Sequence, residues 1–182
     1  LLVIIAAIFT YNLSLHTKSM DTIKKMLTSV STDRRVLILL ISWGFGAFLE
    51  GMAGFGTAIA IPASMLVGIG IQPLTAALVC LIANSVPTAY GSIGIPIVTL
   101  GQITGISPSE LAQYVSLQLA PLDLLCPFLI VIAAGKSIRA LKGMILLTLT
   151  AGLAYLLPEM LVSFFFGLVL ASTWFVSKDI TR

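Results

Sequence analysis

Charged residues are scarce in this sequence. Lysine, arginine, aspartate and glutamate together make up 9% of its 182 residues, whereas hydrophobic residues make up 58% and the mean hydropathy is +1.10. A soluble domain carries about 25% charged residues, so this chain cannot cover a surface that faces water. The composition therefore predicts an all-α membrane protein with several transmembrane helices, and it excludes a soluble domain that binds nucleic acid.

Histidine and cysteine are also rare: the sequence has one histidine and two cysteines. His16 is expected at the membrane surface, and Cys80 and Cys126 lie inside apolar stretches, where free thiols behave as small hydrophobic groups. An intramembrane protease needs a serine with a histidine, or two aspartates in a defined motif, and the sequence offers neither arrangement. We therefore expect no enzyme activity, no metal site and no cofactor.

The basic residues fall in three clusters, and the polar junctions near Glu110 and Glu159 contain none. The clusters are Lys18, Lys24, Lys25, Arg34 and Arg35; then Lys136, Arg139 and Lys142; and finally Lys178 and Arg182. Loops rich in lysine and arginine stay in the cytoplasm. The clusters are therefore predicted to be cytoplasmic, and the two acidic junctions external.

These clusters divide the chain into segments. We expect a helix end at 1–15, an amphipathic segment on the cytoplasmic surface at 18–31, and transmembrane helices at 108–134, 143–157 and 160–176, the last two joined by a turn at Pro158 and Glu159. Because the chain begins at a leucine within an apolar stretch, residues 1–182 are interpreted as a fragment of one longer transmembrane domain.

The apolar block at 36–71 is too long for one simple span. As a straight helix it would extend about 54 Å, against a hydrocarbon core of about 30 Å. Glycines 51, 54 and 56 lie at its midpoint, where they allow the backbone to reverse. The block therefore favours a re-entrant helical hairpin that enters along 36–49 and returns along 57–71. A broken helix followed by a second short span is the alternative.

The next block, 74–103, is also interrupted near its centre. Pro87 lacks a backbone donor and disfavours helix at the residue before it, so we expect a discontinuous transmembrane helix. Irregular backbone at that depth is tolerated only where it is buried in protein or lines a polar cavity. Two neighbouring interrupted segments are typical of the binding site of a transporter.

Two strings in these blocks carry a family resemblance. Residues 43–57 read WGFGAFLEGMAGFGT, followed by IAIP at 59–62, and residues 80–96 read CLIANSVPTAYGSIGIP. The pair closely resembles the bacterial lactate permease family. The resemblance implies a secondary transporter of the bacterial plasma membrane that imports lactate, or glycolate, with a proton. The chain would then cover about a third of such a permease. A channel, or a sodium-coupled carrier for another small organic anion, remains the alternative.

Two acidic residues lie within the apolar blocks. Burial disfavours a charged carboxylate, so Glu50 is a candidate proton carrier, although it could instead accept hydrogen bonds from free backbone donors at the hairpin tip. Asp123 lies between Pro121 and Pro127, and it either bonds the kinked backbone there or relays a proton.

The anion that the resemblance implies would find no lysine or arginine inside these blocks. Its carboxylate would then be held by backbone N–H groups at helix starts, where the helix dipole is positive. The starts after the two breaks are near Gly56 and Thr57, and near Thr88. Asn84 and Ser85, with the two threonines, complete the predicted substrate-binding set. Their alternative role is to cap their own helices.

Overall fold

The computed structural model describes residues 22, 25–26, 29–54 and 56–165. Within these ranges every regular element is a helix. Three helices are long and apolar enough to cross a membrane, namely Arg34–Met52, Pro108–Gly135 and Ile145–Phe165. The all-helical fold class predicted from the sequence is therefore confirmed.

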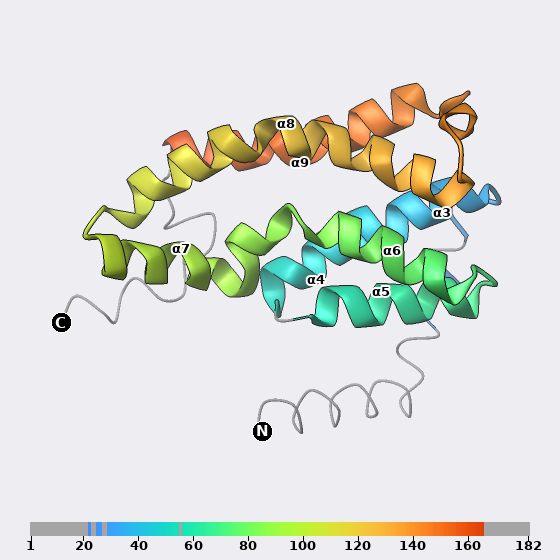
Figure 1. Cartoon of the computed structure of the whole chain (residues 1–182), viewed down its shortest axis with the longest axis horizontal. Coiled ribbons are helices and arrows are strands. Elements are labelled where there is room, and N and C mark those ends of the chain that lie inside the picture. The colour runs from blue at the N-terminus through green and yellow to red at the C-terminus, as the bar shows by residue number, and fades with distance from the viewer. Residues whose placement is uncertain (1–21, 23–24, 27–28, 55, 166–182) are drawn as a thin grey trace, which may run out of the picture.

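Two long antiparallel helices, α8 (Pro108–Gly135) and α9 (Ile145–Phe165), pack together along one side of the molecule (Figure 1). The two helices approach each other closely at Gly152 of α9. A Cβ atom there would lie 3.1 Å from the carbonyl oxygen of Asp123 and 3.2 Å from the Cα atom of Leu124. Glycine at this position therefore permits close backbone contact between the two helices.

Helix α9 corrects one prediction. The sequence suggested helices at 143–157 and 160–176 joined by a turn at Pro158 and Glu159, but α9 runs without a turn through both residues. A proline inside a helix removes one hydrogen bond, whereas a turn in apolar surroundings leaves several backbone groups without a partner. Continuing the helix therefore costs less. The part of the second predicted helix beyond Phe165 lies outside the described residues.

The first hairpin is built from four consecutive elements. They are α3 (Arg34–Leu39), the π-helical segment η1 (Leu40–Phe45), α4 (Gly46–Met52) and α5 (Thr57–Gly68). The first three form one continuous helix, and α5 returns antiparallel to it (Figure 1). Gly54 and Gly56 at the tip have φ angles of 56° and 91°, a region that glycine adopts without steric cost. The depth of this tip in a membrane remains a prediction.

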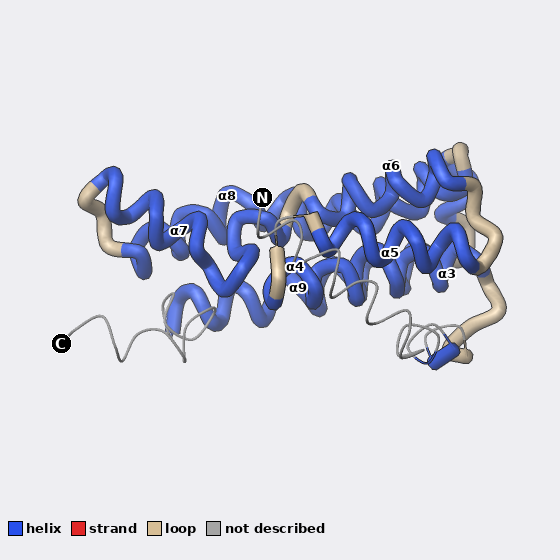
Figure 2. The backbone as a smooth tube through the Cα atoms, turned by 90° about the horizontal axis from the view of Figure 1, so that it is seen from below, coloured by secondary structure: helices blue, strands red, loops and turns tan. Residues whose placement is uncertain are grey.

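The second interrupted segment follows. Helix α6 (Pro73–Asn84) is separated by Ser85 and Val86 from the short 3-10 helix η2 (Pro87–Tyr90), after which α7 (Gly91–Thr104) continues away from α6. Figure 2 shows loop segments at both ends of the molecule and a further set near its middle. The middle set comprises the hairpin tip and the break between α6 and η2, which therefore lie at the same level along the long axis.

Three connections meet at one end of the molecule. Arg35 Nη1 donates to the carbonyl oxygens of Ala140 and Lys142 at 2.8 and 3.3 Å, and Lys136 Nζ donates to Gln72 Oε1 at 3.3 Å. The start of α3, the α5–α6 turn and the α8–α9 connection, which contains η3 (Ile138–Leu141), are thereby held together. We call this the basic end. The α7–α8 connection lies at the opposite end (Figure 1).

Three further predictions from the sequence lie wholly or partly outside the described residues. Residues 1–15 and His16 are not described, and the amphipathic segment 18–31 is described only in part.

The apolar core that the structure does describe packs the hairpin and α6 against α8, with Ile41, Leu66, Val79 and Ile130 almost fully buried. This core fixes the hairpin tip beside the α6–η2 break.

Candidate functional site

The hairpin tip and the α6–η2–α7 break are in direct contact. Ser92 Oγ, on α7, donates a hydrogen bond to the carbonyl oxygen of Ala53 at 2.9 Å. A Cβ atom at Gly54 would overlap the Ser92 side chain, and one at Gly91 would stand 2.5 Å from Glu50 Oε1. Both glycines are therefore needed for the two interrupted segments to approach each other this closely.

A small polar cavity of about 150 Å³ opens where these segments meet. Its lining consists of Glu50, Gly56, Asn84, Thr88, Gly91, Ser92 and Pro96. Sites for drug-sized ligands have volumes of about 300–1,000 Å³, so this cavity is on the scale of a much smaller molecule. Its lining comes from both interrupted segments, namely from α4 and the start of α5, and from the end of α6, η2 and α7.

Glu50 reaches the cavity from the last turns of α4. The residue is 3% exposed, and its Oε2 atom has no hydrogen-bond partner among the described residues. The described part of the chain also provides no ion pair for it, because the single salt bridge found there joins Arg35 to Asp33. Glu50 is thus a buried carboxyl beside a polar cavity, without a basic partner to hold it as an anion.

Asn84 and Thr88 face each other across the break. Asn84 Nδ2 donates to Thr88 Oγ1 at 3.0 Å, and Thr88 Oγ1 donates to the carbonyl oxygen of Asn84. Asn84 Oδ1 is buried and has no partner among the described residues. Part of the capping role considered for these residues is therefore realised. One acceptor oxygen is left free at the cavity.

Two of the predicted residues do not line the cavity. Thr57 Oγ1 donates to the carbonyl oxygen of Gly54 at 2.7 Å, within the hairpin tip. Ser85 Oγ donates to the carbonyl oxygen of Ile82 at 2.7 Å and lies 3.8 Å from Cys126 Sγ, so it faces α8. The structure therefore gathers Gly56, Asn84 and Thr88 around Glu50, but not these two hydroxyls.

Two helix starts lie at the cavity and lack a side-chain cap. The cap residue of α5 is Gly56, which has no side chain to offer, and the cap residue of α7 is Tyr90, whose hydroxyl bonds elsewhere. The first N–H groups of a helix have no partner within it, and with the dipole they form a ready site for an anion. The start of α7 at Gly91 lies three residues beyond the one predicted near Thr88.

Asp123 lies away from this cavity, on the side of α8 that meets α9. It is fully buried, and neither carboxylate oxygen has a hydrogen-bond partner among the described residues. Sequence reasoning missed its neighbour Glu159, because Pro158 was interpreted as a turn. It also missed Tyr90, which donates to the carbonyl oxygen of Ala112 at 2.9 Å. The sequence signal available for Tyr90 was its polar side chain close to the break at Pro87.

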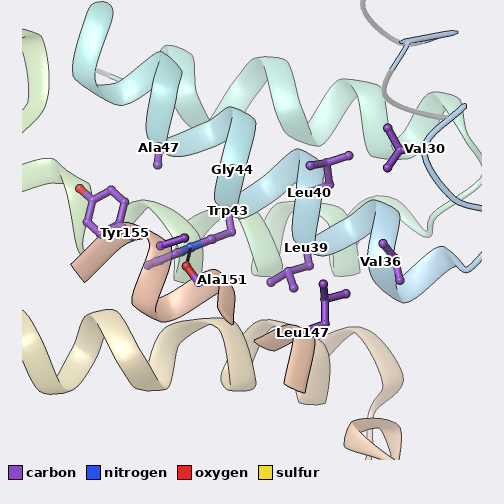
Figure 3. A pocket seen from close by; sticks show the side chains of 11 residues that line it. Val30, Val36, Leu39, Leu40, Trp43, Gly44, Ala47, Leu147, Ala151 and Tyr155 are labelled. Carbon is purple, nitrogen blue, oxygen red and sulfur yellow. Dashed lines mark hydrogen bonds between the residues drawn. The ribbon is translucent and has the colours of Figure 1, made fainter. Parts of the chain in front are cut away.

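A larger cavity of about 430 Å³ lies between α9 and the helix Arg34–Met52 (Figure 3). Its lining is almost entirely aliphatic and aromatic, and Trp43 meets Tyr155 edge to face with ring centroids 5.3 Å apart. The indole N–H of Trp43 already donates to the carbonyl oxygen of Ala151 at 3.2 Å. Apart from the Tyr155 hydroxyl this lining has little to offer a small anion, so the smaller cavity is the candidate site.

Comparisons with known proteins agree on one family. The family model described as L-lactate permease matches residues 1–174. An L-lactate permease of Streptococcus iniae is 51% identical over 170 residues, covering 93% of this chain and 36% of that protein. The L-lactate permease of Escherichia coli strain K12 is 41% identical over 165 residues, covering 91% of this chain and 30% of that protein.

Glycolate permease GlcA of the same Escherichia coli strain is 45% identical over 129 residues, covering 71% of this chain and 23% of that protein. No solved structure matches the chain. The chain therefore spans about a third of the length of the curated relatives it matches.

Proposed function

Because the chain belongs to the L-lactate permease family, we propose that it carries part of the substrate site of a secondary active transporter. The substrate class is lactate and related 2-hydroxy monocarboxylates such as glycolate, taken up with a proton across the bacterial plasma membrane. One observation carries the proposal. The two interrupted segments enclose a small polar cavity that offers a buried carboxyl, a free amide oxygen and two uncapped helix starts.

The carboxylate of the substrate binds at the starts of α5 and α7. Gly56 and Gly91, at these two starts, line the same cavity, and a helix dipole is positive at such a start. The N–H groups of Thr57 and Ile59 already donate to the carbonyl oxygens of Gly54 and Gly56, so the anion binds to the N–H groups that remain. The described part of α4 to α7 contains no lysine or arginine, so the backbone is the available source of positive potential. Gly56 and Gly91 support this arrangement, because the absence of a side chain lets an anion approach the backbone.

The 2-hydroxyl group of the substrate binds Asn84. A buried acceptor without a partner costs about 1–3 kcal/mol, and Asn84 Oδ1 has no partner among the described residues. A hydroxyl donor next to the bound carboxylate would remove this cost. Thr88 holds the amide group of Asn84 in place through the 3.0 Å hydrogen bond. Such a pair would favour a hydroxy acid over an acid that lacks the hydroxyl group.

Glu50 carries the coupled proton. A lactate anion that enters alone moves against an inside-negative potential, at about 2.3 kcal/mol per 100 mV, and a proton that travels with it removes this charge. A protonated Glu50 is neutral and can donate a hydrogen bond to the substrate. After it loses the proton, its negative charge repels the anion and favours release.

The membrane placement follows from the basic end. Arg34, Arg35, Lys136, Arg139 and Lys142 belong to the connections at this end, and the positive-inside rule assigns such loops to the cytoplasm. The hairpin tip and the α6–η2 break then lie at mid-depth, where irregular backbone is tolerated because it lines a polar cavity. Residues 36–71 are accordingly a re-entrant hairpin in this proposal.

The test uses the full-length permease in lipid vesicles, with labelled lactate. An inward proton gradient should drive accumulation above the external concentration, and a proton uncoupler should abolish it. Equilibration without accumulation would instead indicate a channel, and accumulation driven by a sodium gradient would indicate a sodium-coupled carrier.

Glu50→Gln sharpens this test, because glutamine keeps the shape and neutral charge of a protonated glutamate but cannot release a proton. The variant should lose accumulation driven by a pH gradient, while exchange of internal for external lactate survives at least in part. Accumulation by Glu50→Gln at the rate of the unmodified protein would show that another group carries the proton.

A further inference from the structure

A second set of acidic side chains is buried between α8 and α9, outside the cavity. Asp123 is 0% exposed, and both of its carboxylate oxygens lack a hydrogen-bond partner among the described residues. Both carboxylate oxygens of Glu159 on α9 are also buried without a partner there. Asp123 is close enough to Glu159 for the two charges to interact. No hydrogen bond or ion pair in the described part of the chain explains why either carboxyl is present.

The two carboxyls follow each other along the long axis of the molecule. Gly152 on α9 packs directly on Asp123 of α8. Glu159 comes seven residues after Gly152, which places it on nearly the same face of α9 and about 10 Å farther along the helix. Since α9 starts at the basic end, Glu159 lies nearer the α7–α8 connection and Asp123 nearer the basic end.

Hydroxyl groups lie near Glu159. The side chain of Tyr90 lies next to this carboxyl and also next to Ser116 and Ser163. Ser116 and Ser163 are fully buried, and Ser163 Oγ has no hydrogen-bond partner among the described residues. Hydroxyl groups can both donate and accept, so they can pass a proton to and from a carboxyl.

Tyr90 connects this group to the substrate cavity. Its hydroxyl donates to the carbonyl oxygen of Ala112 on α8, while the next residue in the chain, Gly91, lies against the carboxyl of Glu50. The short helix η2 therefore has the α8–α9 interface on one side and the candidate substrate site on the other. A structural change at either site would therefore displace the same short helix, η2.

Among the residues that the structure describes, none near the two carboxyls is a cation that could hold them as anions. The titratable groups that face them are Tyr90 from η2, Tyr155 from α9, Cys126 from α8 and, through Tyr155, Glu50 from α4. Helices α6 and α7 contain no charged residue, and the arginines of α3 lie at the basic end. Among the described residues no three acidic, histidine or cysteine side chains converge as they would around a metal ion.

We propose that the α8–α9 interface is the route of the transported proton, with Glu159 as its outer binding group and Asp123 as its inner one. A carboxylate buried in apolar surroundings without a cation beside it is costly, so the pair retains a proton. In each transfer an O–H bond of one carboxyl breaks and an O–H bond of the other forms, through intervening hydroxyl groups or water. This inference rests on the proposed function, since it names the path of the proton whose coupling was assigned to Glu50.

The test measures two fluxes on the same vesicles containing the full-length permease. One is the entry of protons that accompanies lactate, followed with a trapped pH-sensitive dye, and the other is exchange of labelled for unlabelled lactate. Glu159→Gln and Asp123→Asn should each lose lactate-driven proton entry yet retain exchange, because exchange needs no net movement of a proton. Glu110→Gln is the matched control, since this exposed acidic residue lies in the first turn of α8 and should leave both fluxes unchanged.

Two results would overturn the proposal. The first is proton entry at the unmodified rate in both Glu159→Gln and Asp123→Asn. The second is lactate entry that follows a sodium gradient and ignores pH. If a variant loses exchange as well, the conservative Glu159→Asp variant decides, because the restored carboxyl should recover proton entry. Absence of lactate exchange in the unmodified protein would instead contradict the proposed substrate. Failure of the proton route and failure of the proposed function can therefore be distinguished.

Discussion

Gly91 at the start of α7 lies directly against the carboxyl group of Glu50 near the end of α4. A Cβ atom at position 91 would stand 2.5 Å from Glu50 Oε1 and 3.3 Å from its carboxyl carbon. The first of these distances is impossible for real atoms, but the clashing group is the end of a flexible side chain. The position of the Glu50 carboxyl therefore depends on the absence of a side chain at Gly91, where the two interrupted segments meet.

Gly91→Ala should displace the Glu50 carboxyl without unfolding the protein. We expect lactate accumulation driven by a pH gradient to fall sharply, while the protein stays folded in detergent and loses about 1–3 kcal/mol of stability. The control is Gly51→Ala, next to Glu50 in sequence, where an added Cβ would meet no atom within 4 Å. Equal losses of transport in the two variants would contradict the assigned importance of the Gly91–Glu50 contact.

Asn84→Ala should erase the preference for a 2-hydroxy acid. Removing Asn84 Oδ1, the buried acceptor without a partner, takes away a hydrogen bond that lactate can make and propionate cannot. An unmet buried polar group is worth about 1–3 kcal/mol, so discrimination between the two acids should drop about 5- to 150-fold. Competition by unlabelled propionate against labelled lactate measures it.

Thr99→Ala, on the exposed side of α7, serves as the control for this experiment. It removes a polar group from α7, a neighbouring helix that also borders the cavity, without touching the cavity lining. If Asn84→Ala lowered the affinity for lactate and propionate by the same factor, Asn84 would contribute to the shape of the site and not to recognition of the hydroxyl group.

The main path of the chain could be predicted from the lengths of the apolar blocks and from the glycine and proline residues that interrupt them. A 36-residue apolar block with glycines at its centre has few solutions in a membrane, and Pro87 removes a helical donor wherever it lies. The contacts within the site could be predicted only in part. Thr57 and Ser85 use their hydroxyls on the carbonyl groups of Gly54 and Ile82, and such local bonding competes with ligand binding at every serine and threonine.

The α8–α9 interface was beyond the reach of sequence reasoning for a physical reason. Pro158 followed by Glu159 reads as a polar turn, because proline and an acidic residue are both common where helices end. Packing against α8 overrides this local preference and keeps α9 continuous. The contact of Tyr90 with Ala112 joins residues 22 positions apart, and no periodicity within one helix indicates it.

Asp33 should make the start of α3 sensitive to acid. Its carboxylate accepts hydrogen bonds from the backbone N–H and guanidinium of Arg35, at 2.9 and 2.8 Å, and this holds the pKa of Asp33 below its usual range. A lowered pKa in the folded state means that the stabilisation is present above the unfolded value of about 3.9 and is lost as pH falls through the folded value. Thermal unfolding followed against pH in detergent measures this loss.

Two variants of Asp33 separate its roles. Asp33→Ala removes the helix cap and should cost about 1 kcal/mol at neutral pH, and it should flatten the acid dependence. Asp33→Asn keeps a side chain that can cap but has no charge, so it should retain most of the stability and also lose the acid dependence. An unchanged pH profile in Asp33→Ala would show that another group is responsible.

Cysteine labelling should place the two ends of the molecule on opposite sides of the membrane. Thr32 and Gln72 both lie at the basic end, whereas Ile106 lies in the α7–α8 connection and is 42% exposed. With a thiol reagent that cannot cross the membrane, applied to intact cells, Ile106→Cys should react, and Thr32→Cys and Gln72→Cys should react only after permeabilisation. The native Cys80 and Cys126 are buried, so they should contribute little background. Reaction of Thr32→Cys and Gln72→Cys from opposite faces would rule out the re-entrant hairpin, because the segment between them would then cross the membrane.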